Sequence, residues 1–425
     1  METTLVAEQN SSLASLYEDA RSQLGAEPSW LTELRASAWD VFQRKGLPTT
    51  KMEDWRFMPL HVLKENDFRL ASHGSMDAVP GEWSARLSIV NGRCVEVAGD
   101  LPDGAVVCSL REAVERMPDL VERFLAVQTP PSTHAFAALN AALFLDGAFV
   151  HIPKGVRIEK PILIAYRSQG AGTANFPRAL VIAEESAEAV IVEEFLSSGL
   201  TWTSPVTEIF VSPNAHVEHV RLQRESLEAI HLASMGVYIE RDAVAASQSI
   251  SFGGALARLD IGAKLDGENI DCTLNGLYFA GQDQLVGNFT SIDHAMPNCQ
   301  SHELYKGILD ANGKGVFTGK IFVRQDAQKT DAKQTNQALL LSEDAQINSK
   351  PQLEIFADDV KCTHGATVGY LEQDPLFYLR SRGIPKRDAE SILVFAFAND
   401  LVQRIPVESI RDQLESWLFE RLKTA

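Results

Sequence analysis

The chain has 425 residues, of which 45% are hydrophobic and 23% charged, and its formal net charge is −18 at pH 7. This composition is ordinary for a soluble globular protein, and the acidic balance without a Lys/Arg-rich run argues against nucleic acid as a partner. No basic and apolar leader opens the chain, and its longest apolar run, residues 392–398, is far shorter than the roughly 20 residues of a membrane helix. We therefore predict a cytoplasmic protein without membrane insertion, and five widely spaced cysteines fit free thiols in a reducing compartment.

The first part of the chain, residues 1–95, is predicted to form a mainly helical domain. Its clearest element is an amphipathic helix that Pro28 opens and Gly46 ends, with apolar residues at helical spacing between them. Apolar residues at helical spacing also predict a helix over residues 112–127.

From about residue 149 the helical period gives way to short β-branched runs separated by polar or glycine turns. Several turns share a form, a polar residue followed by a small one, and the small residues Ala187, Ala215 and Ala243 recur at a step of 28 residues. A degenerate repeat of strands without helices indicates a solenoid of stacked β rungs. A sandwich or barrel would also show many short strands and stays open, whereas a doubly wound α/β domain needs helical crossovers that this pattern lacks.

We therefore predict a mainly β fold, in which a parallel β-helix core of residues 96–370 lies between the N-terminal helical domain and a C-terminal helical domain of residues 371–425. Apolar stripes predict two helices in the C-terminal domain, after Pro385 and after Pro406. These helices are expected to block the open end of the solenoid, because exposed rungs require a cap. Amide side chains near that end would suit ladders between rungs: Gln328, Gln334, Asn336, Gln337, Gln346 and Asn348.

The most informative candidate site is the pair Cys362 and His364. Side chains two residues apart in an extended chain point to one face, so this thiol and this imidazole would project together as two metal ligands. They suit zinc, copper or an iron–sulfur cluster better than magnesium or calcium. Two ligands do not close a tetrahedral site, so the others would come from elsewhere in the fold, a second chain or the cargo. The competing interpretation is structural, because cysteine is often a small buried hydrophobe.

Other parts of the chain give weaker signals. Cys299 and His302, with His294 nearby, could serve zinc, although a packed cysteine beside exposed histidines is the favoured interpretation. Four glutamates could pair for glycan chemistry, but solvated faces of adjacent rungs are favoured for Glu184, Glu185, Glu193 and Glu194. No Gly-rich phosphate loop, GxSxG elbow or HExxH motif occurs, so another chain would have to bind any ATP.

Directly after the candidate half-site, the pattern changes from strand to helix at about Glu372. Asp374-Pro375 is typical of an N-cap followed by proline at N1. Gly383 followed by Pro385 would end this helix.

Five segments of the sequence carry a family resemblance. They are EDWRFMPL, SIDHAMPNCQSHELYKGIL, GKIFVRQDAQKTDAKQTNQALLLSEDA, PQLEIFADDVKCTHGATVG and LFYLRSRGIP. Together they resemble the SufB/SufD family, the scaffold subunits of the SUF iron–sulfur cluster assembly machine, from residue 49 to the C-terminus. Within that family, the length, the early EDW segment and KCTHGATVG are similar to the SufD branch.

The resemblance implies a right-handed parallel β-helix flanked by helical domains, in a complex with a SufB-like paralogue and a SufC-like ABC ATPase. It implies that Cys362 and His364 correspond to the Cys and His of the family's CxHG block, with the histidine holding a transient iron–sulfur cluster shared with the partner. The ATPase would bind the C-terminal helical region, where we single out Phe377, Tyr378, Arg380 and Arg382. Reduced flavin is associated with the family's assembled complex, and a homodimer in the absence of the partner is a further expectation.

We therefore predict a non-catalytic scaffold subunit of a SufBCD complex, which supports nascent clusters at its interface with SufB and couples to the SufC ATPase. The alternative is a self-contained β-helix enzyme or metal protein, which would show a cleft with perturbed acids and be active as a single chain. The absent nucleotide motif and the incomplete ligand set favour the scaffold.

Overall fold

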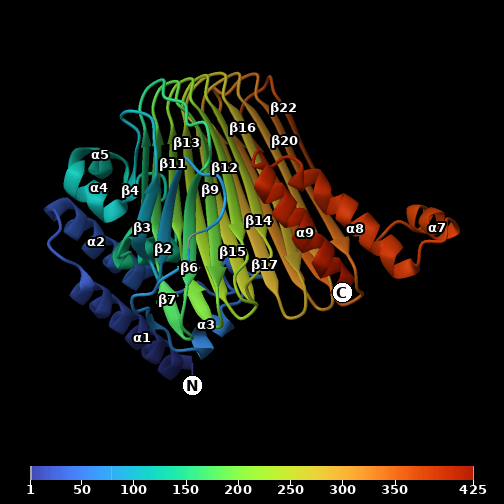
Figure 1. Ribbon diagram of the computed structural model, residues 1–425, viewed down its shortest axis with the longest axis horizontal. Helices are drawn as coiled ribbons and strands as arrows, with labels where there is room; N and C mark the ends of the chain where they lie inside the picture. The colour runs from blue at the N-terminus through green and yellow to red at the C-terminus, as the bar shows by residue number, and fades with distance from the viewer. Residues whose placement is uncertain (1, 78, 425) are drawn as a thin grey trace.

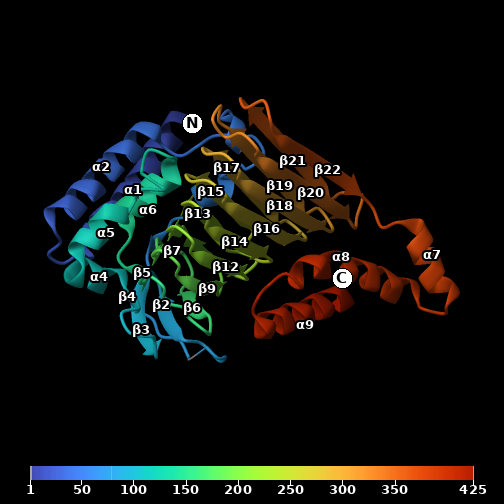
Figure 2. The same cartoon turned by 90° about the horizontal axis from the view of Figure 1, so that it is seen from above.

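The computed structural model describes residues 2–77 and 79–424, with the side chains of residues 12–77 and 79–421. A parallel β-solenoid flattened into two sheets forms its centre, with helices around one end and along one face (Figures 1 and 2). Every pairing along the solenoid from β5 to β22 is parallel and in register, so the mainly β fold with a solenoid core between helices is confirmed. A sandwich is thereby excluded.

The two sheets alternate along the chain, one strand of each per turn. The first sheet has the order β21-β19-β17-β15-β13-β11-β8-β5-β4. Its strands, with three short ones beside this path, are β1 (Arg69–Leu70), β4 (Val106–Ser109), β5 (Gly147–Ile152), β7 (Thr173–Asn175), β8 (Arg178–Ala183), β10 (Thr201–Thr203), β11 (Val206–Val211), β13 (Ile230–Ile239), β15 (Leu256–Leu265), β17 (Leu285–His294), β19 (Lys314–Val323) and β21 (Gln346–Ile355).

The second sheet has the order β22-β20-β18-β16-β14-β12-β9-β6-β2-β3. Its strands are β2 (Ala85–Val90), β3 (Arg93–Gly99), β6 (Ile162–Ser168), β9 (Glu188–Ser197), β12 (His216–Gln223), β14 (Val244–Ser251), β16 (Asp271–Ala280), β18 (Gln300–Leu309), β20 (Asp331–Leu340) and β22 (Lys361–Gly369). The helices are α1 (Glu2–Gln23), α2 (Ser29–Lys45), the short 3-10 turn η1 (Glu53–Trp55), α3 (His61–Glu65), α4 (Leu110–Arg116), α5 (Pro118–Phe124), α6 (Ala135–Leu143), α7 (Gln373–Ser381), α8 (Lys386–Val402) and α9 (Glu408–Thr424).

The repeated polar-then-small pattern forms one corner of the solenoid. The residues before Ala187, Ala215 and Ala243 adopt the left-handed conformation, each with φ of 60°, and the alanines are buried. Short polar residues tolerate this conformation better than bulky ones. The amide of His216 donates to the carbonyl of Ala187, and that of Val244 to the carbonyl of Ala215, so the step of 28 residues is one turn of the solenoid.

The N-terminal helices differ in part from the prediction. The helix expected between Pro28 and Gly46 is α2, and it packs on the apolar helix α6. The helix expected over residues 112–127 is wrong as one element, because Pro118 lacks an amide hydrogen and starts a separate helix, so α4 and α5 form instead. The sequence pattern also missed α6, which is apolar and buried on all sides and therefore shows no stripe.

Regular elements cross the predicted boundary at residue 95. Strand β2 lies before it and pairs with β6 inside the second sheet, whereas helices α4 to α6 lie after it. The division into three domains stays a prediction.

The C-terminal helices lie along the outer face of the second sheet and leave the end of the solenoid uncovered (Figure 2). The Trp417 ring of α9 stacks on Phe252 with a centroid distance of 4.2 Å, and Nζ of Lys306 on β18 lies 2.7 Å from a carboxylate oxygen of Asp400 on α8. The expectation that these helices block the open end is therefore wrong. Their apolar stripes cover a sheet face that carries its own apolar residues, such as Ile250.

Among the described helices, none combines the length and the apolar character that a bilayer crossing requires.

Candidate functional site

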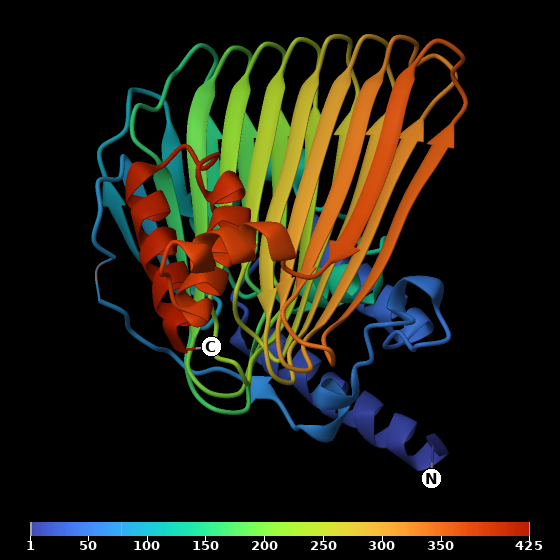
Figure 3. The same ribbon diagram turned by 90° about the vertical axis from the view of Figure 1, so that its right-hand side faces the viewer.

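Strand β22 forms the last rung of the solenoid, at the end opposite helices α1 and α2 (Figures 1 and 2), and Figure 3 shows the stacked strands from this end. Among the described strands it pairs with β20 alone, where Cys362 lies opposite Ala332 and His364 lies opposite Gln334. Both residues of β20 point into the solenoid and are buried. Because registered neighbours share a face, Cys362 and His364 lie together on the inward side of the last rung, as their spacing predicts.

The free edge of β22 is formed by the backbone of the same residues. The amide of Lys361 donates to the carbonyl of Thr330 at 2.8 Å and so faces β20. In a parallel sheet, alternate residues direct both of their backbone groups to the same neighbour. The groups of Cys362, His364 and Ala366 therefore face the open side, where no strand of the described chain pairs with them.

The last strand of the other sheet, β21, presents an interrupted edge. The amide of Gln346 donates to the carbonyl of Gly313, on the side of β19. Because alternate residues direct their backbone groups to the same side, Pro351 is one of the positions whose backbone faces the free edge. Proline has no amide hydrogen and interrupts a row of edge donors. Around both edges lie exposed apolar side chains: Ile355, Phe356, Val368 and Tyr370.

The environment of Cys362 keeps its side chain protonated. The thiol is partly buried against an apolar cluster that includes Ile321 and Val323, and this burial raises its pKa above the usual value; the amide of Ala332 opposes the shift, and the charge of Asp331 adds to it. A cysteine must lose this proton to bind a metal. His364 is exposed, and within the described residues no three His, Cys, Asp or Glu side chains gather as a metal site. The pair is therefore a two-ligand half-site in geometry, and its metal-binding role stays a prediction.

The structure does not bring Cys299, His294 and His302 together. The Cys299 sulfur is buried 3.1 Å from the carbonyl of Gly267, and a ring nitrogen of His294 lies 2.8 Å from the Ser301 hydroxyl inside the solenoid. His302 lies exposed on the opposite face of β18. The packed cysteine is thus confirmed, and the expectation of an exposed histidine is right for His302 and wrong for His294.

The expectation that all four glutamates are solvated is wrong for Glu193 and Glu194. The Glu193 carboxylate is fully buried and accepts hydrogen bonds from Tyr166 at 2.8 Å and Thr207 at 2.9 Å. Glu194 is paired with Arg167 and with Arg224. The strand alternation contains this signal, because Glu193 lies two residues from the buried Ile191 and so shares its inward face.

A serine, a histidine and a carboxylate also line up inside the solenoid. The His219 ring lies 3.0 Å from the Ser247 hydroxyl on one side and 3.0 Å from the Glu193 carboxylate on the other. This order matches a nucleophile with its base. His219 and Ser247 are only 1% and 4% exposed, however, so no substrate reaches them and the cluster is structural.

Helix α7 projects away from the body of the molecule (Figure 2). Its N-cap is Glu372 instead of the predicted Asp374, and Gly383, with φ of 88°, ends it as expected. Phe377 and Tyr378 are 75% and 58% exposed. The arginines of the predicted contact set are exposed as well: Arg380 and Arg382. All four predicted partner-binding residues thus lie together on the surface of α7 and its C-cap, and their role stays a prediction.

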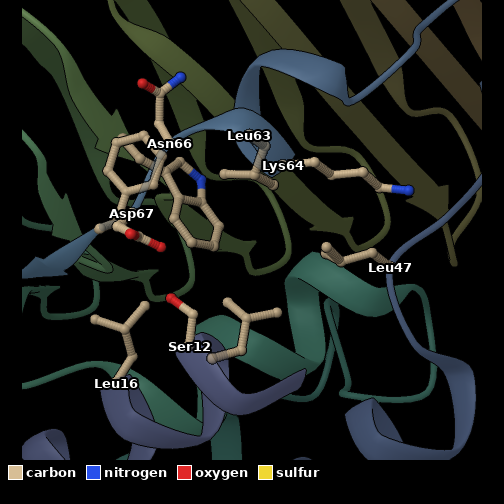
Figure 4. Close-up of a pocket in the computed structure, with 10 residues that line it drawn as sticks. Ser12, Leu16, Leu47, Leu63, Lys64, Asn66 and Asp67 are labelled. Carbon is tan, nitrogen blue, oxygen red and sulfur yellow. The ribbon is translucent and has the colours of Figure 1, made fainter. Parts of the chain in front are cut away.

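Pockets elsewhere do not include the candidate residues. A cavity of about 130 Å³ lies between α1 and the segment before β1, with Leu16, Leu63 and Asp67 among the side chains around it (Figure 4). A larger cavity of about 550 Å³ lies between α2 and α4. Neither is lined by Cys362 or His364.

Comparison with known proteins gives a consistent family. The model described as SUF system FeS cluster assembly, SufBD core domain, matches residues 166–397, and the SufBD protein N-terminal region matches residues 7–164. The chain is 34% identical to the iron-sulfur cluster assembly protein SufD of Escherichia coli, over 89% of this chain and 90% of that protein. It is 32% identical to a SufBD family protein of Synechocystis over 95% and 93% of the two chains, and 27% identical to SufD of Bacillus subtilis over 96% and 97%. With both parts of its length matched and its solenoid open at the rung that carries Cys362 and His364, the chain belongs to the SufB/SufD family of iron–sulfur cluster assembly proteins.

Proposed function

We propose that this chain is a non-catalytic scaffold subunit of the cytoplasm, which supports nascent iron–sulfur clusters at an interface with a SufB-like paralogue. The observation that carries the proposal is the last rung: an unpaired strand edge, exposed apolar side chains and an incomplete pair of ligands lie at one end of the solenoid. A partner that adds a strand to β22 would bury the apolar side chains and bring further ligands to Cys362 and His364. A second copy of the chain would use the same edge when the paralogue is absent.

We further propose that a SufC-like ATPase binds α7 and acts on this interface. Phe377 and Tyr378 are large exposed side chains on a helix that projects from the body, as a docking element requires. Helix α8 follows α7 directly and is anchored to β18 by Lys306 and Asp400. Movement of α7 on ATP binding would therefore reach the strands near the cluster end and shift the population of interface states.

Reduced flavin in the assembled complex stays a prediction. Two of the polar side chains around the cavity of about 550 Å³ already have partners: Arg35 donates to Glu27 and to the carbonyl of Phe144, and Asp146 accepts from the amides of Arg111 and Gly147. The proposal therefore takes no step through flavin, and the cluster is its cargo.

The test is co-expression with SufB-like and SufC-like partners, purification without oxygen, and measurement of cluster absorbance per complex for the wild type and His364→Ala. We expect the variant complex to assemble but to hold several-fold less cluster, because one of the two ligands of this chain is lost. His302→Ala is the matched control, since it removes an exposed imidazole from the outward face of β18.

Normal cluster content in the His364→Ala complex would mean that Cys362 and His364 are structural. The subunit would then be a mechanical arm for the ATPase.

A further inference from the structure

The last rungs of the solenoid contain a polar interior column that ends at His364. Glu303 of β18 lies opposite Gln334 of β20, and Gln334 lies opposite His364 of β22. Side chains in register on neighbouring parallel strands point to the same face. The three residues therefore follow one another along the inside of the solenoid toward its open end, and Glu303 and Gln334 are only 2% and 1% exposed.

Gln334 has a partner on one side of its amide only. Its Nε2 donates to Oε2 of Glu303 at 2.6 Å. Its Oε1 is buried without a hydrogen-bond partner among the described residues. Ionised Glu303 only accepts hydrogen bonds, so in this state it turns the NH₂ group of Gln334 toward itself, and the amide oxygen is left for a donor other than Glu303.

The nearest side chain of the next rung in this column is His364. An unpaired buried acceptor is costly, whereas an exposed imidazole changes rotamer within nanoseconds. A ring N–H of His364 is a suitable donor, because a neutral imidazole carries one donor and one acceptor nitrogen.

We propose that Gln334 is a positioning residue for His364: its amide oxygen accepts a hydrogen bond from one ring N–H and so leaves the other nitrogen free to bind a metal at the open end. The inference rests on the proposed role of His364 in holding the cluster. Metal-ligating histidines commonly donate their second N–H to a carboxylate, a carbonyl or water, which fixes the tautomer and the ring orientation. Here the amide oxygen of Gln334 is the acceptor for that second N–H, and the hydrogen bond to Glu303 fixes the orientation of the Gln334 amide.

The contact is tested on the whole chain without metal, by NMR of protein labelled with ¹⁵N in its histidines. Two-bond nitrogen–hydrogen couplings report which ring nitrogen carries the proton. The chain has ten histidines, and the signals of His364 are those that disappear in His364→Ala. We expect one tautomer for His364 and a mixture for the exposed, outward-facing His302.

Gln334→Met keeps the length of the side chain and removes the acceptor, so His364 should change to the mixture that His302 shows. Gln337→Met is the matched control, because Gln337 lies on the outward face of the same strand. A wild-type His364 with the tautomer mixture of His302 would overturn the proposal without any variant. A single tautomer that persists in folded Gln334→Met would overturn it too.

Cluster content separates this inference from the function on which it rests. In the assembled complex, Gln334→Met should lower cluster absorbance per complex and Gln337→Met should not. If the tautomer depends on Gln334 but the His364→Ala complex fills normally, the positioning contact stands and the cluster-binding role of His364 falls.

Discussion

Two carboxyl groups inside the solenoid have pKa values that are shifted in opposite directions. Burial alone would raise the pKa of Glu193, but the hydrogen bonds with His219 and Tyr166 outweigh it and lower that pKa below its usual value. Burial raises the pKa of Glu303 to about 7, because Thr290 and Gln334 oppose it only in part. Charge state in the solenoid thus depends on neighbours from other rungs.

Glu303→Gln should therefore change how stability depends on pH. The folded pKa of about 7 lies above the ordinary value of 4.5, so the wild type loses stability as the pH rises through this interval. Near neutral pH the loss approaches about 3 kcal/mol. Glutamine does not ionise, so the free energy of unfolding of Glu303→Gln in urea, relative to that of wild type, should increase by about 2.5 kcal/mol between pH 5 and pH 8. The exposed Glu343→Gln is the control, and an equal difference at both pH values for Glu303→Gln would contradict the prediction.

For single residues, the sequence predicts which face of a strand a side chain points to, but it does not predict the hydrogen-bond partners of that side chain. The alternation of an extended chain is sufficient to place Cys362 and His364 on one face. It does not show that Glu193 is satisfied by Tyr166 and His219, because both come from other rungs of the solenoid. Buried polar networks of this kind depend on the register of the stack.

At the scale of single elements, the two strands that end the solenoid differ in their edges. Strand β22 leaves alternate amides free, whereas β21 carries Pro351 at an outward position. Long open edges are aggregation hazards that proteins commonly manage with proline or charge. Of these two described strands, β22 therefore offers the continuous edge to a partner strand.

Ala366→Pro should weaken pairing with the partner and leave the fold intact. The amide of Ala366 faces the open side, so its loss removes no hydrogen bond within the chain and removes one donor from the edge. We expect an unchanged melting temperature within a few degrees and at least about tenfold weaker association with the SufB-like partner, from the lost bond and a steric clash. Ala366→Val, which keeps the amide, is the control in pull-down and sedimentation experiments. Undiminished association of the proline variant would mean that the partner does not add a strand to β22.

Elements with a clear periodic pattern could be predicted, and those without one could not. The stripe of α2 and the turn pattern of the rungs are both local signals. Helix α6 has no stripe because it is buried on all sides, and the break at Pro118 was hidden by apolar residues that continue the spacing on both sides. The end of β22 and the start of α7 were visible because the period changes there.

On the scale of the whole molecule, the open end that carries Cys362 and His364 is distinct from the sheet face that carries α8 and α9. Their apolar stripes are evident in the sequence, but a stripe does not show which surface it covers. The outer face of the second sheet is apolar along several rungs, so the two helices pack there and leave the last rung free. The position of α8 and α9 therefore depends on which apolar surface of the solenoid is available for packing, and a single helix pattern does not contain this information.

Replacing Phe377 and Tyr378 by alanine should uncouple the chain from the ATPase without disturbing the solenoid. Both side chains are largely exposed, so their loss costs little stability. Binding of a SufC-like partner in a pull-down should fall at least about tenfold, because exposed aromatic side chains often dominate interfaces. Leu227→Ala, an exposed apolar residue in the turn before β13, is the control. Full binding by the double variant would place the ATPase elsewhere.

The proline in β21 also limits how two solenoids can meet. The edge of β22 has a continuous row of amide donors, and the edge of β21 is interrupted. A partner chain can therefore extend the sheet of β22 with more hydrogen bonds than the sheet of β21. Rotating the partner to exchange the two sheets would lose hydrogen bonds, so one orientation is selected over its alternative. That selection would keep the ligands of both chains on the same side of the joint each time a complex forms.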